Sequence, residues 1–373
     1  MKAGWPQRKI DDICDFRGGG TPSKANENYW RGEIPWVSPK DMKSDVITDS
    51  IDHISANAIE ESTTNLIPSG SVLVVVRSGI LARTVPVAIT GREVAINQDI
   101  KALCPDKSVD SWFLFYFLKS RLEEMLALAS RGATVHRIMA DQIRAMEIPV
   151  PPLAEQQRIV GVLDEAFASL ATAQAHAAQN LQNARALFES CIQVEFGKDV
   201  ALGELVDIKT GKLDANAAEE DGEYPFFTCS RETYAINNYA FDCEAVLLAG
   251  NNAVGDFNVK HYVGKFNAYQ RTYVITINSR KRAISRYLYY QLQKNLAKFK
   301  SQSVGTGTKF LKLGMIKDMM IPLPTIPEQS RIVNQLDALA AETQRLAQIY
   351  EQKLAALAAL KKSLLHQAFS GEL

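Results

Sequence analysis

The sequence predicts a mixed α/β protein in which two globular domains are separated by two long helices that form an antiparallel coiled coil within the chain. The first observation is a repeat, because the junction segment at residues 148–160 returns at residues 321–333. Helical periodicity follows each copy of this junction, and short strand patterns precede it. Solenoid repeats recur every ~20–50 residues, so this longer spacing indicates a duplicated unit of domain plus helix. We therefore expect pseudo-twofold symmetry.

The two copies of the junction divide the chain into four expected parts. They are a first globular domain at 1–152, a central helix at 153–197, a second globular domain at 198–325 and a C-terminal helix at 326–373. Both junctions are rich in proline, which fixes φ and has no N–H to continue a strand ladder. Each globular domain is therefore expected to end at its junction.

The two globular segments show the same succession of patterns. A buried strand pattern at 72–76 matches one at 245–249. Short aromatic helices are expected to begin near residues 112 and 286, with their rings in the cores rather than stacked on bases. Each segment also has a glycine-bearing loop near its start and near its end, at residues 17–22, 130–136, 209–212 and 303–309.

Apolar residues recur at alternating steps of four and three along both helical segments, which is the spacing of a coiled coil. The alternative is two unrelated core helices, but both segments keep the same register relative to their junctions. Polar Asn180 and Lys353 occupy equivalent positions and are expected to help set the register. The residues expected in the seam are Ile159, Leu163, Leu170, Ala177, Leu187, Ile332, Leu336, Leu346, Tyr350, Leu357 and Leu364.

Composition excludes several classes of protein. No apolar run is long enough to cross a membrane, and the first residues lack the apolar core of a signal peptide. Five cysteines without a Cys-x-x-Cys pair indicate reduced thiols in a cytoplasmic protein. The net charge is zero, so the chain alone is expected to bind DNA only modestly, with a partner neutralising most of the phosphates. The first helix is also poor in charge, which suggests cover by another subunit.

The sequence carries no recognisable catalytic or metal-binding motif. The string at 305–310 has the wrong spacing for a phosphate-binding loop, and the Pro-Pro pair at 151–152 lacks the flanking residues of an amino-methyltransferase motif. The histidines are not spaced as metal ligands. The pattern therefore favours a binding and scaffolding subunit without catalysis, cofactor or metal of its own.

Taken together, these residues resemble a known family, the specificity subunits of type I restriction–modification systems. The resemblance covers essentially the whole chain. It is carried by the doubled Glu-Gln-x-x-Ile junction, by Gly-Gly-Thr-Pro at 19–22 and by the terminal Phe-Ser-Gly-Glu-Leu at 369–373. The second half departs from the first, with Asn251 and Asn252 where the first has Arg77 and Ser78. The two halves are therefore not expected to read the same bases.

The resemblance implies a function for each part. Each globular half would be a target recognition domain that reads one half of a bipartite, asymmetric site in double-stranded DNA. The coiled coil would set the spacer and dock two modification subunits, which are adenine methyltransferases using S-adenosylmethionine. Restriction subunits, which are motor nucleases using ATP and Mg²⁺, would join through the complex. No membrane partner is implied.

Candidate DNA-contacting residues are polar side chains in loops. Arg and Lys suit guanine, Asn and Gln suit adenine, and Ser and Thr suit phosphate. A turn-capping role is the alternative for Asn97 and Asn252. The candidates are Thr21, Ser23, Lys24, Trp30, Lys40, Arg77, Ser78, Arg83, Gln98, Arg131, His136, Arg137, Lys212, Ser230, Arg231, Asn251, Asn252, Gln270, Arg271, Thr308 and Lys309.

Two other classes of function stay open on the sequence. One is a diverged nuclease or methyltransferase, which would show weak activity with magnesium or S-adenosylmethionine. The other is a free-standing DNA-binding or bridging protein with no modification partner. Neighbouring methyltransferase and helicase–nuclease genes would favour the specificity subunit over both.

Overall fold

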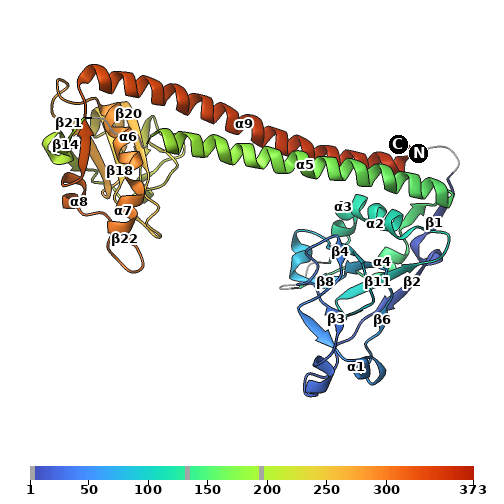
Figure 1. Ribbon diagram of the computed structural model, residues 1–373. Helices are drawn as coiled ribbons and strands as arrows, with labels where there is room; N and C mark the ends of the chain where they lie inside the picture. The colour runs from blue at the N-terminus through green and yellow to red at the C-terminus, as the bar shows by residue number, and fades with distance from the viewer. Residues whose placement is uncertain (1–4, 131–134, 193–196) are drawn as a thin grey trace. The chain divides into compact units, whose positions relative to one another are not determined.

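The computed structural model describes residues 5–130, 135–192 and 197–373, and the chain divides into two compact units (Figure 1). Unit 1 comprises Met1–His176 with Lys353–Leu373, and unit 2 comprises Ala177–Gln352. Each long helix therefore contributes one part of its length to each unit.

Unit 1 contains two larger sheets. The first has the strand order β2-β11-β7-β9-β4, and the second has the order β5-β3-β10-β6. Most neighbours are antiparallel, but β3 runs parallel to β10 and β4 runs parallel to β9. The strands are β2 (Cys14–Gly18), β3 (Ile34–Val37), β4 (Val46–Ile47), β5 (Asp52–Ile54), β6 (Leu66–Ile67), β7 (Val72–Val75), β9 (Val87–Thr90), β10 (Val94–Ile96) and β11 (Ile100–Pro105).

Helix α2 (Ser111–Ser120) lies between the first sheet and the long helices of unit 1. The Asp110 carboxylate caps it by accepting hydrogen bonds from Trp112 N and Phe113 N. The helix buries most of its aromatic side chains in the core, as the sequence predicts. Short helices accompany it in this unit: α1 (Ala56–Glu60), α3 (Leu122–Ala127) and α4 (Ala140–Arg144).

Unit 2 repeats this plan around a sheet with the order β15-β21-β18-β20-β16-β17. Helix α6 (Ser285–Lys294) contacts both this sheet and the long helix that follows it, as α2 does in unit 1 (Figure 1). Helices α7 (Leu296–Gln302) and α8 (Leu313–Lys317) come next. The strands are β15 (Val206–Thr210), β16 (Tyr224–Phe227), β17 (Tyr234–Ile236), β18 (Phe241–Ala249), β20 (Val259–Ala268) and β21 (Thr272–Ile277).

The first and last strands of each globular part pair with each other. In unit 1, β1 (Gln7–Lys9) is antiparallel to β13 (Glu147–Pro149), the strand that leads into the first junction. In unit 2, β14 (Lys198–Ala201) is antiparallel to β23 (Met320–Leu323). The chain therefore enters and leaves each globular part at the same place.

The long helices are α5 (Leu153–Cys191) and α9 (Ile326–Ser370), and they run antiparallel within each unit. In unit 1, the Lys361 ammonium lies 4.9 Å from the centroid of the Phe167 ring. In unit 2, Arg185 and Glu351 form an ion pair of 3.0 Å. The predicted fold class, two α/β domains separated by two long paired helices, is confirmed.

The detailed register of the seam differs from the prediction. Leu187 on α5, which was expected in the seam, is 51% exposed, and Asn180 and Lys353 are exposed as well. One inward position per heptad recurs every seven residues as predicted, but the second inward position of several heptads lies four residues after it instead of three. The inward positions are Leu163, Leu170, Ala177, Leu181, Ala184 and Phe188 on α5, and Leu336, Thr343, Tyr350, Leu354, Leu357, Lys361 and Leu364 on α9.

At three of the expected positions the next residue along the chain faces inward instead, namely Leu181, Phe188 and Leu354. Burying these apolar side chains is more favourable than burying Asn180 or Lys353. Asn180 and Lys353 consequently do not set the register, and that prediction is wrong. The remaining expected seam residues are buried or half-buried.

In the described part of the chain, none of the helices combines the length and the apolar character of a membrane span.

Candidate nucleic-acid interface

In unit 1 the structure brings together four candidate residues that come from two distant segments of the chain. Strand β8 (Arg77–Ser78) pairs antiparallel with β12 (His136–Arg137), so that Arg77 lies opposite Arg137 and Ser78 lies opposite His136. Arg77 and Arg137 are exposed, and the other two residues are half-buried. We call this pair of strands the unit 1 ribbon.

Unit 2 has a ribbon of the same construction, the unit 2 ribbon. Strand β19 (Asn251–Asn252) pairs antiparallel with β22 (Lys309–Phe310), which lies on a loop that projects from the unit (Figure 1). The backbone hydrogen bonds establish the correspondence. Ile138 N donates to Val76 O in unit 1, and Leu311 N donates to Gly250 O in unit 2. The same backbone therefore carries different side chains in the two units.

A glycine loop lies beside a glutamine in each unit. A Cβ on Gly19 would lie 1.9 Å from Ile96 O, and a Cβ on Gly211 would lie 1.7 Å from Ala268 O. Only glycine permits this approach, which is why each loop needs one. The glutamines follow shortly after these carbonyls. Gln98 Oε1 accepts a hydrogen bond of 2.7 Å from Thr21 Oγ1, and Gln270 Nε2 donates one of 2.5 Å to Asp214 Oδ1.

The residue after each glutamine joins this loop to the ribbon. Asp99 O accepts from Val76 N in unit 1, and Arg271 O accepts from Gly250 N in unit 2. Asp99 and Arg271 are therefore equivalent positions that hold opposite charges. Arg271 is among the candidates expected from the sequence, whereas Asp99 is not. The glutamine that directly precedes each of them was the signal that could have paired the two positions.

The remaining unit 1 candidates lie around the second sheet. The Trp36 indole donates to Gly20 O, and the Trp30 ring packs edge-on against Trp36 with centroids 5.0 Å apart. The Trp30 indole donates to Ser23 O, and Lys24 Nζ lies 5.9 Å from the Trp30 ring centroid. Trp30 thus packs beside the glycine loop and is not an isolated ring on the surface.

Two of the unit 1 cations occupy other settings. Lys40 Nζ forms an ion pair of 2.7 Å with Asp52. Arg83 follows the 3-10 turn that begins beside the ribbon at Ser78, and its side chain lines a groove with Lys361 and Lys362. Arg131 lies outside the described residues.

The remaining unit 2 candidates are divided between paired and exposed side chains. Arg231 forms a bidentate ion pair with Asp256, with both closest contacts at 2.9 Å. Ser230 caps a turn by accepting from Glu232 N, and its carbonyl accepts from Lys260 Nζ. Desolvation lowers the pKa of Lys260 below its usual value. Lys212 is exposed beside Gly211, and Thr308 is half-buried beside β22.

The two asparagines with an alternative interpretation both cap turns. Asn97 Oδ1 accepts from Asp99 N at 3.1 Å, and Asn252 Oδ1 accepts from Val254 N at 2.9 Å and from Asp256 N at 3.2 Å. These bonds occupy the side-chain oxygen of each amide. The turn-capping interpretation of Asn97 and Asn252 is therefore supported, and Asn251 is the more available amide of the pair on β19.

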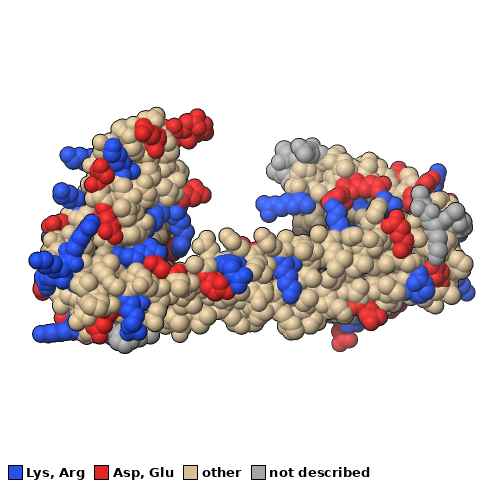
Figure 2. Space-filling model, turned by 90° about the horizontal axis from the view of Figure 1, so that it is seen from above, with Lys and Arg blue, Asp and Glu red and all other residues tan. Residues whose placement is uncertain are grey.

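Charged side chains of both signs are mixed over the globular part of each unit, whereas the long helices present mostly uncharged atoms (Figure 2). On the face seen in Figure 2, basic side chains of the globular parts are interspersed with acidic ones. Electrostatic attraction to phosphate alone would be weak for such a surface. Local geometry at the ribbons, rather than overall charge, distinguishes them from the rest of each unit.

The repeated junction motif fastens each long helix to its globular part. Gln156, at 0% exposure, accepts from Asp110 N and donates to Ser108 O and Pro151 O. Gln329, also at 0% exposure, makes the corresponding bonds to Ile284 N, Arg282 O and Pro324 O. The glutamine of the repeated Glu-Gln sequence thus has a structural role, because it links each long helix to its globular part.

A second pair of equivalent bonds follows two turns later on each helix. Tyr116 donates to Asp164 at 2.5 Å, and Tyr290 donates to Asp337 at 2.5 Å. Desolvation, followed by the bond to the carboxylate, raises the pKa of both tyrosines well above the usual value. Both phenols therefore stay protonated as donors across the physiological range.

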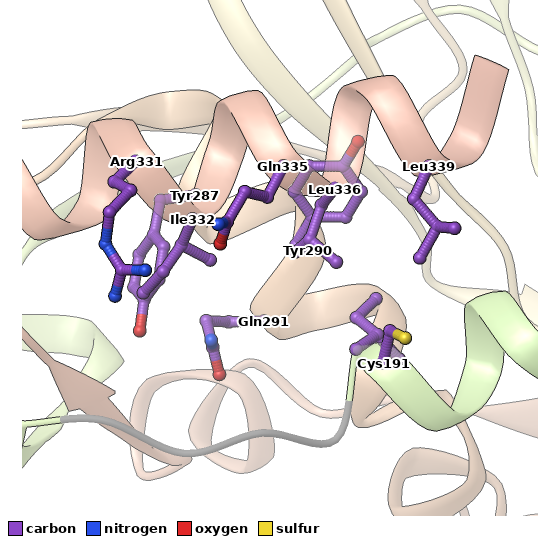
Figure 3. Close-up of a pocket in the computed structure, with 10 residues that line it drawn as sticks. Cys191, Tyr287, Tyr290, Gln291, Arg331, Ile332, Gln335, Leu336 and Leu339 are labelled. Atoms are coloured by element: carbon purple, nitrogen blue, oxygen red, sulfur yellow. The ribbon is translucent and has the colours of Figure 1, made fainter. Parts of the chain in front are cut away.

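The two units differ where a long helix meets the aromatic helix of the globular part. In unit 1 the ring of Phe369 packs against Phe113 and Phe117, with centroids 5.1 and 5.5 Å apart. In unit 2 the position equivalent to Phe117 is Gln291, and a cavity of about 370 Å³ remains beside it (Figure 3). The cavity is lined mainly by apolar side chains, and Gln291 Oε1 has no hydrogen-bond partner among the described residues.

The described residues contain no cluster of metal-ligating side chains. Among them, no group of three His, Cys, Asp or Glu side chains is placed to hold a metal ion. The described residues that line the cavity of unit 2 include no carboxylate and no imidazole that could act as a base. The fold is a duplicated α/β architecture with paired long helices.

Comparison with known proteins identifies the family. The family described as type I restriction modification DNA specificity domain matches residues 2–180 and 197–352. These segments cover most of the chain, and the chain belongs to this family. Its members include specificity subunits, so the predicted non-catalytic class agrees with the family.

Curated relatives carry the same description. The type I restriction enzyme EcoDI specificity subunit of Escherichia coli is 44% identical over 176 residues, which are 47% of this chain and 38% of the relative. The EcoR124I/EcoR124II specificity subunit of Escherichia coli is 38% identical over 160 residues, which are 42% of this chain and 40% of the relative. The matched segments thus span about two fifths of the length of these relatives.

Solved structures share the fold. A chain from a study of complex assembly and conformational transition of the type I R-M system superimposes with a TM-score of 0.80, at 18% identity over 100% of this chain and 99% of the other. The HsdS subunit from Thermoanaerobacter tengcongensis gives a TM-score of 0.61, at 18% identity over 100% and 98%. At this identity the similarity shows the fold alone.

Proposed function

We propose that this chain is the DNA-specificity subunit of a type I restriction–modification complex. Each globular part reads one half of a bipartite, asymmetric site in double-stranded DNA. The long helices set the spacer between the half-sites and dock two adenine methyltransferase subunits. S-adenosylmethionine would bind in those partners, and ATP and Mg²⁺ would bind in restriction subunits that join the same complex.

One observation carries this proposal: the two ribbons share a backbone and differ in their side chains. Arg77 and Ser78 stand where the second ribbon has Asn251 and Asn252. Arginine suits the acceptors of guanine in the major groove, and asparagine suits the donor and acceptor of adenine. A shared framework with different hydrogen-bonding groups is what reading two different half-sites requires.

The helices support the spacer role. Helix α5 is 39 residues long and continuous, which corresponds to about 58 Å at ~1.5 Å per residue. A recognition protein with two reading domains engages half-sites about one helical turn of DNA or a multiple of it apart. A continuous helix holds its length better than a flexible linker would, so the spacing of the half-sites can be specified.

The exposed faces of the helices support partner docking. Apolar side chains are exposed at Val162, Leu187, Ile349 and Leu360, and charged side chains are sparse along the helices (Figure 2). In the proposed complex, the docked methyltransferase subunits would cover these side chains. The zero net charge agrees with a complex in which the partner supplies much of the phosphate neutralisation.

The decisive experiment is methylome sequencing of cells that express the chain together with its methyltransferase partner. The expected result is methylated adenine within a bipartite motif that has two defined half-sites and an undefined spacer of constant length. Cells with the methyltransferase alone are the control and should show no such motif. Methylation without sequence preference in the presence of the chain would contradict the proposal.

A further inference from the structure

Each ribbon has an exposed arginine, and the two arginines come from different segments of their units. In unit 1 the arginine is Arg77, on the first strand of the ribbon, and the equivalent residue of unit 2 is Asn251. In unit 2 the arginine is Arg271, in the loop beside the ribbon, and the equivalent residue of unit 1 is Asp99. Each unit therefore has an arginine at its ribbon. These two arginines do not occupy equivalent positions, because Arg77 corresponds to an asparagine in unit 2 and Arg271 corresponds to an aspartate in unit 1.

In unit 1 the partner of the arginine is an acid. Arg77 Nε lies 3.7 Å from Asp99 Oδ1, and the Arg77 side chain is 56% exposed. Asp99 is itself held in place, because its Oδ2 accepts from Asn97 Nδ2 and its N–H donates to Asn97 Oδ1. Asp99 Oδ1 is buried and has no hydrogen-bond partner among the described residues. The nearby guanidinium therefore balances the charge of this carboxylate through Nε, which leaves its terminal nitrogens for another acceptor.

The strand opposite Arg77 adds a second constraint. Arg137 is its cross-strand partner, so two arginines occupy directly opposite positions on the same ribbon. Like charges at such positions destabilise a strand pair. A ligand rich in hydrogen-bond acceptors would relieve this repulsion. The unit 1 ribbon is thus built for an electron-rich edge or an anion.

In unit 2 the partner of the arginine is an aromatic ring. The Arg271 guanidinium lies 5.2 Å from the centroid of Phe310, which occupies the position equivalent to Arg137. Arg271 is exposed, and its carbonyl is held by Gly250 N. Stacking on an aromatic face orients a guanidinium plane without using its N–H donors. Arg231, the nearby alternative, is already paired with Asp256.

We propose that Arg77 and Arg271 each read a guanine, one in each half-site, and that Asp99 and Phe310 are the positioning residues that orient the two guanidinium groups. This inference rests on the proposed function, because it assigns a base to each half of the site. Guanine presents two acceptors, N7 and O6, to which an arginine binds through two parallel hydrogen bonds. Lysine can donate to the same acceptors, but it lacks the rigid planar fork that fixes two parallel hydrogen bonds, so it should discriminate less sharply.

The test measures base preference at every position of the two half-sites. The chain and its methyltransferase partner are assayed for methyl transfer on a duplex library in which each half-site is randomised. Arg77→Lys should reduce discrimination for guanine at one position of one half-site by about 10- to 100-fold, and Arg271→Lys should do so in the other half-site. Preferences at the other positions should persist.

The positioning residues are tested by double-mutant cycles. Asp99→Asn and Phe310→Leu should each weaken the same guanine preference as the lysine variant of their arginine. Asp99→Asn should have no further effect on base preference when Arg77 is already alanine, and Phe310→Leu should have none when Arg271 is alanine. Phe310→Tyr keeps the aromatic face and should retain the preference. Thermal melting identifies any variant whose fold has been lost.

The possible outcomes separate this inference from the proposed function. If the wild-type complex methylates a bipartite motif but the lysine variants leave every base preference unchanged, the arginine assignment is wrong and the proposed function stands. A uniform loss of methylation on all sequences would identify phosphate contacts and also overturn the assignment. If the wild-type complex shows no sequence preference, the proposed function itself fails.

Discussion

Gln156 and Gln329 are the residues whose role is clearest at the level of single side chains. Each is fully buried and satisfies three backbone groups, of which one belongs to its own junction and two precede the aromatic helix of the globular part. Buried polar groups without partners are costly, so these amides couple the start of each long helix to the domain before it. The repeat in the sequence located them but could not show their partners.

Replacing the first of these glutamines should destabilise unit 1. Gln156→Leu leaves Asp110 N and the carbonyls of Ser108 and Pro151 without their side-chain partner, which should cost about 3 kcal/mol. The measurement is the free energy of unfolding from urea denaturation. Gln157→Leu, at the exposed neighbouring position, is the matched control and should change the stability by less than about 0.5 kcal/mol. Equal effects of the two substitutions would contradict the fastening role.

At the cavity of unit 2 we expect a substitution to raise the free energy of unfolding rather than to lower it. Gln291→Leu removes the buried Oε1 that lacks a partner among the described residues and places an apolar group beside the cavity. The substitution should raise the unfolding free energy of unit 2 by about 1 kcal/mol. Hydrogen exchange of amides in α6 reports this unit separately from unit 1. A loss of protection there would show that the amide has a structural partner.

At the scale of elements, the long helices and their pairing could be predicted from the sequence, but their register could not. Their existence and antiparallel pairing follow from long apolar periodicity and from the doubled junction. Their detailed register did not, because the second inward position of a heptad can lie three or four residues after the first, and the choice depends on the partner helix. Leu187 was expected inside and is exposed, whereas Phe188 is half-buried beside the Tyr290 ring.

The ribbons show a similar division. Arg77, His136, Asn251 and Lys309 were singled out individually from loop position and residue type. Their pairing depends on contacts between segments far apart in the chain, which no local pattern encodes. The acid at 99 and the aromatic ring at 310 were missed for the same reason, because such groups signal recognition only when an arginine is seen beside them.

Lengthening the helices tests whether they set the spacer. Inserting one heptad after Ala173 and one after Leu346 keeps the apolar stripe nearly aligned and lengthens each helix by about 10 Å at ~1.5 Å per residue. That length corresponds to about three base pairs at ~3.4 Å each. The methylome should show unchanged half-sites with a spacer longer by about three base pairs. Altered half-sites with an unchanged spacer would contradict the spacer role.

At the scale of the whole molecule, the lack of any recognised catalytic motif in the sequence leads to a direct expectation. The purified chain should neither methylate nor cleave DNA when S-adenosylmethionine, ATP and magnesium are supplied. Transfer of a radiolabelled methyl group and gel analysis of a plasmid measure the two activities. Addition of the methyltransferase partner is the positive control and should restore methyl transfer. Substantial activity of the chain alone would place a catalytic site within it.

Exchange of a whole globular part tests the independence of the two half-sites. Replacing residues 201–320 with the corresponding segment of a related chain should change one half-site of the methylated motif and leave the other unchanged. The reason is that each unit has its own core and its own ribbon. Methylome sequencing reads both half-sites at once. Simultaneous change in both would show that the units read the DNA jointly.

The pairing of the first and last strands of each globular part has an evolutionary consequence. Because β1 lies against β13 and β14 lies against β23, the gene segment for either part begins and ends at codons whose products are neighbours in space. Recombination at those two points would transfer an intact folding module that keeps both strands of the terminal pair. The glutamine at the start of the long helix already in the chain could then bind the new module. Lineages could thus acquire new recognition sequences by shuffling modules, without the slow accumulation of compensating point mutations.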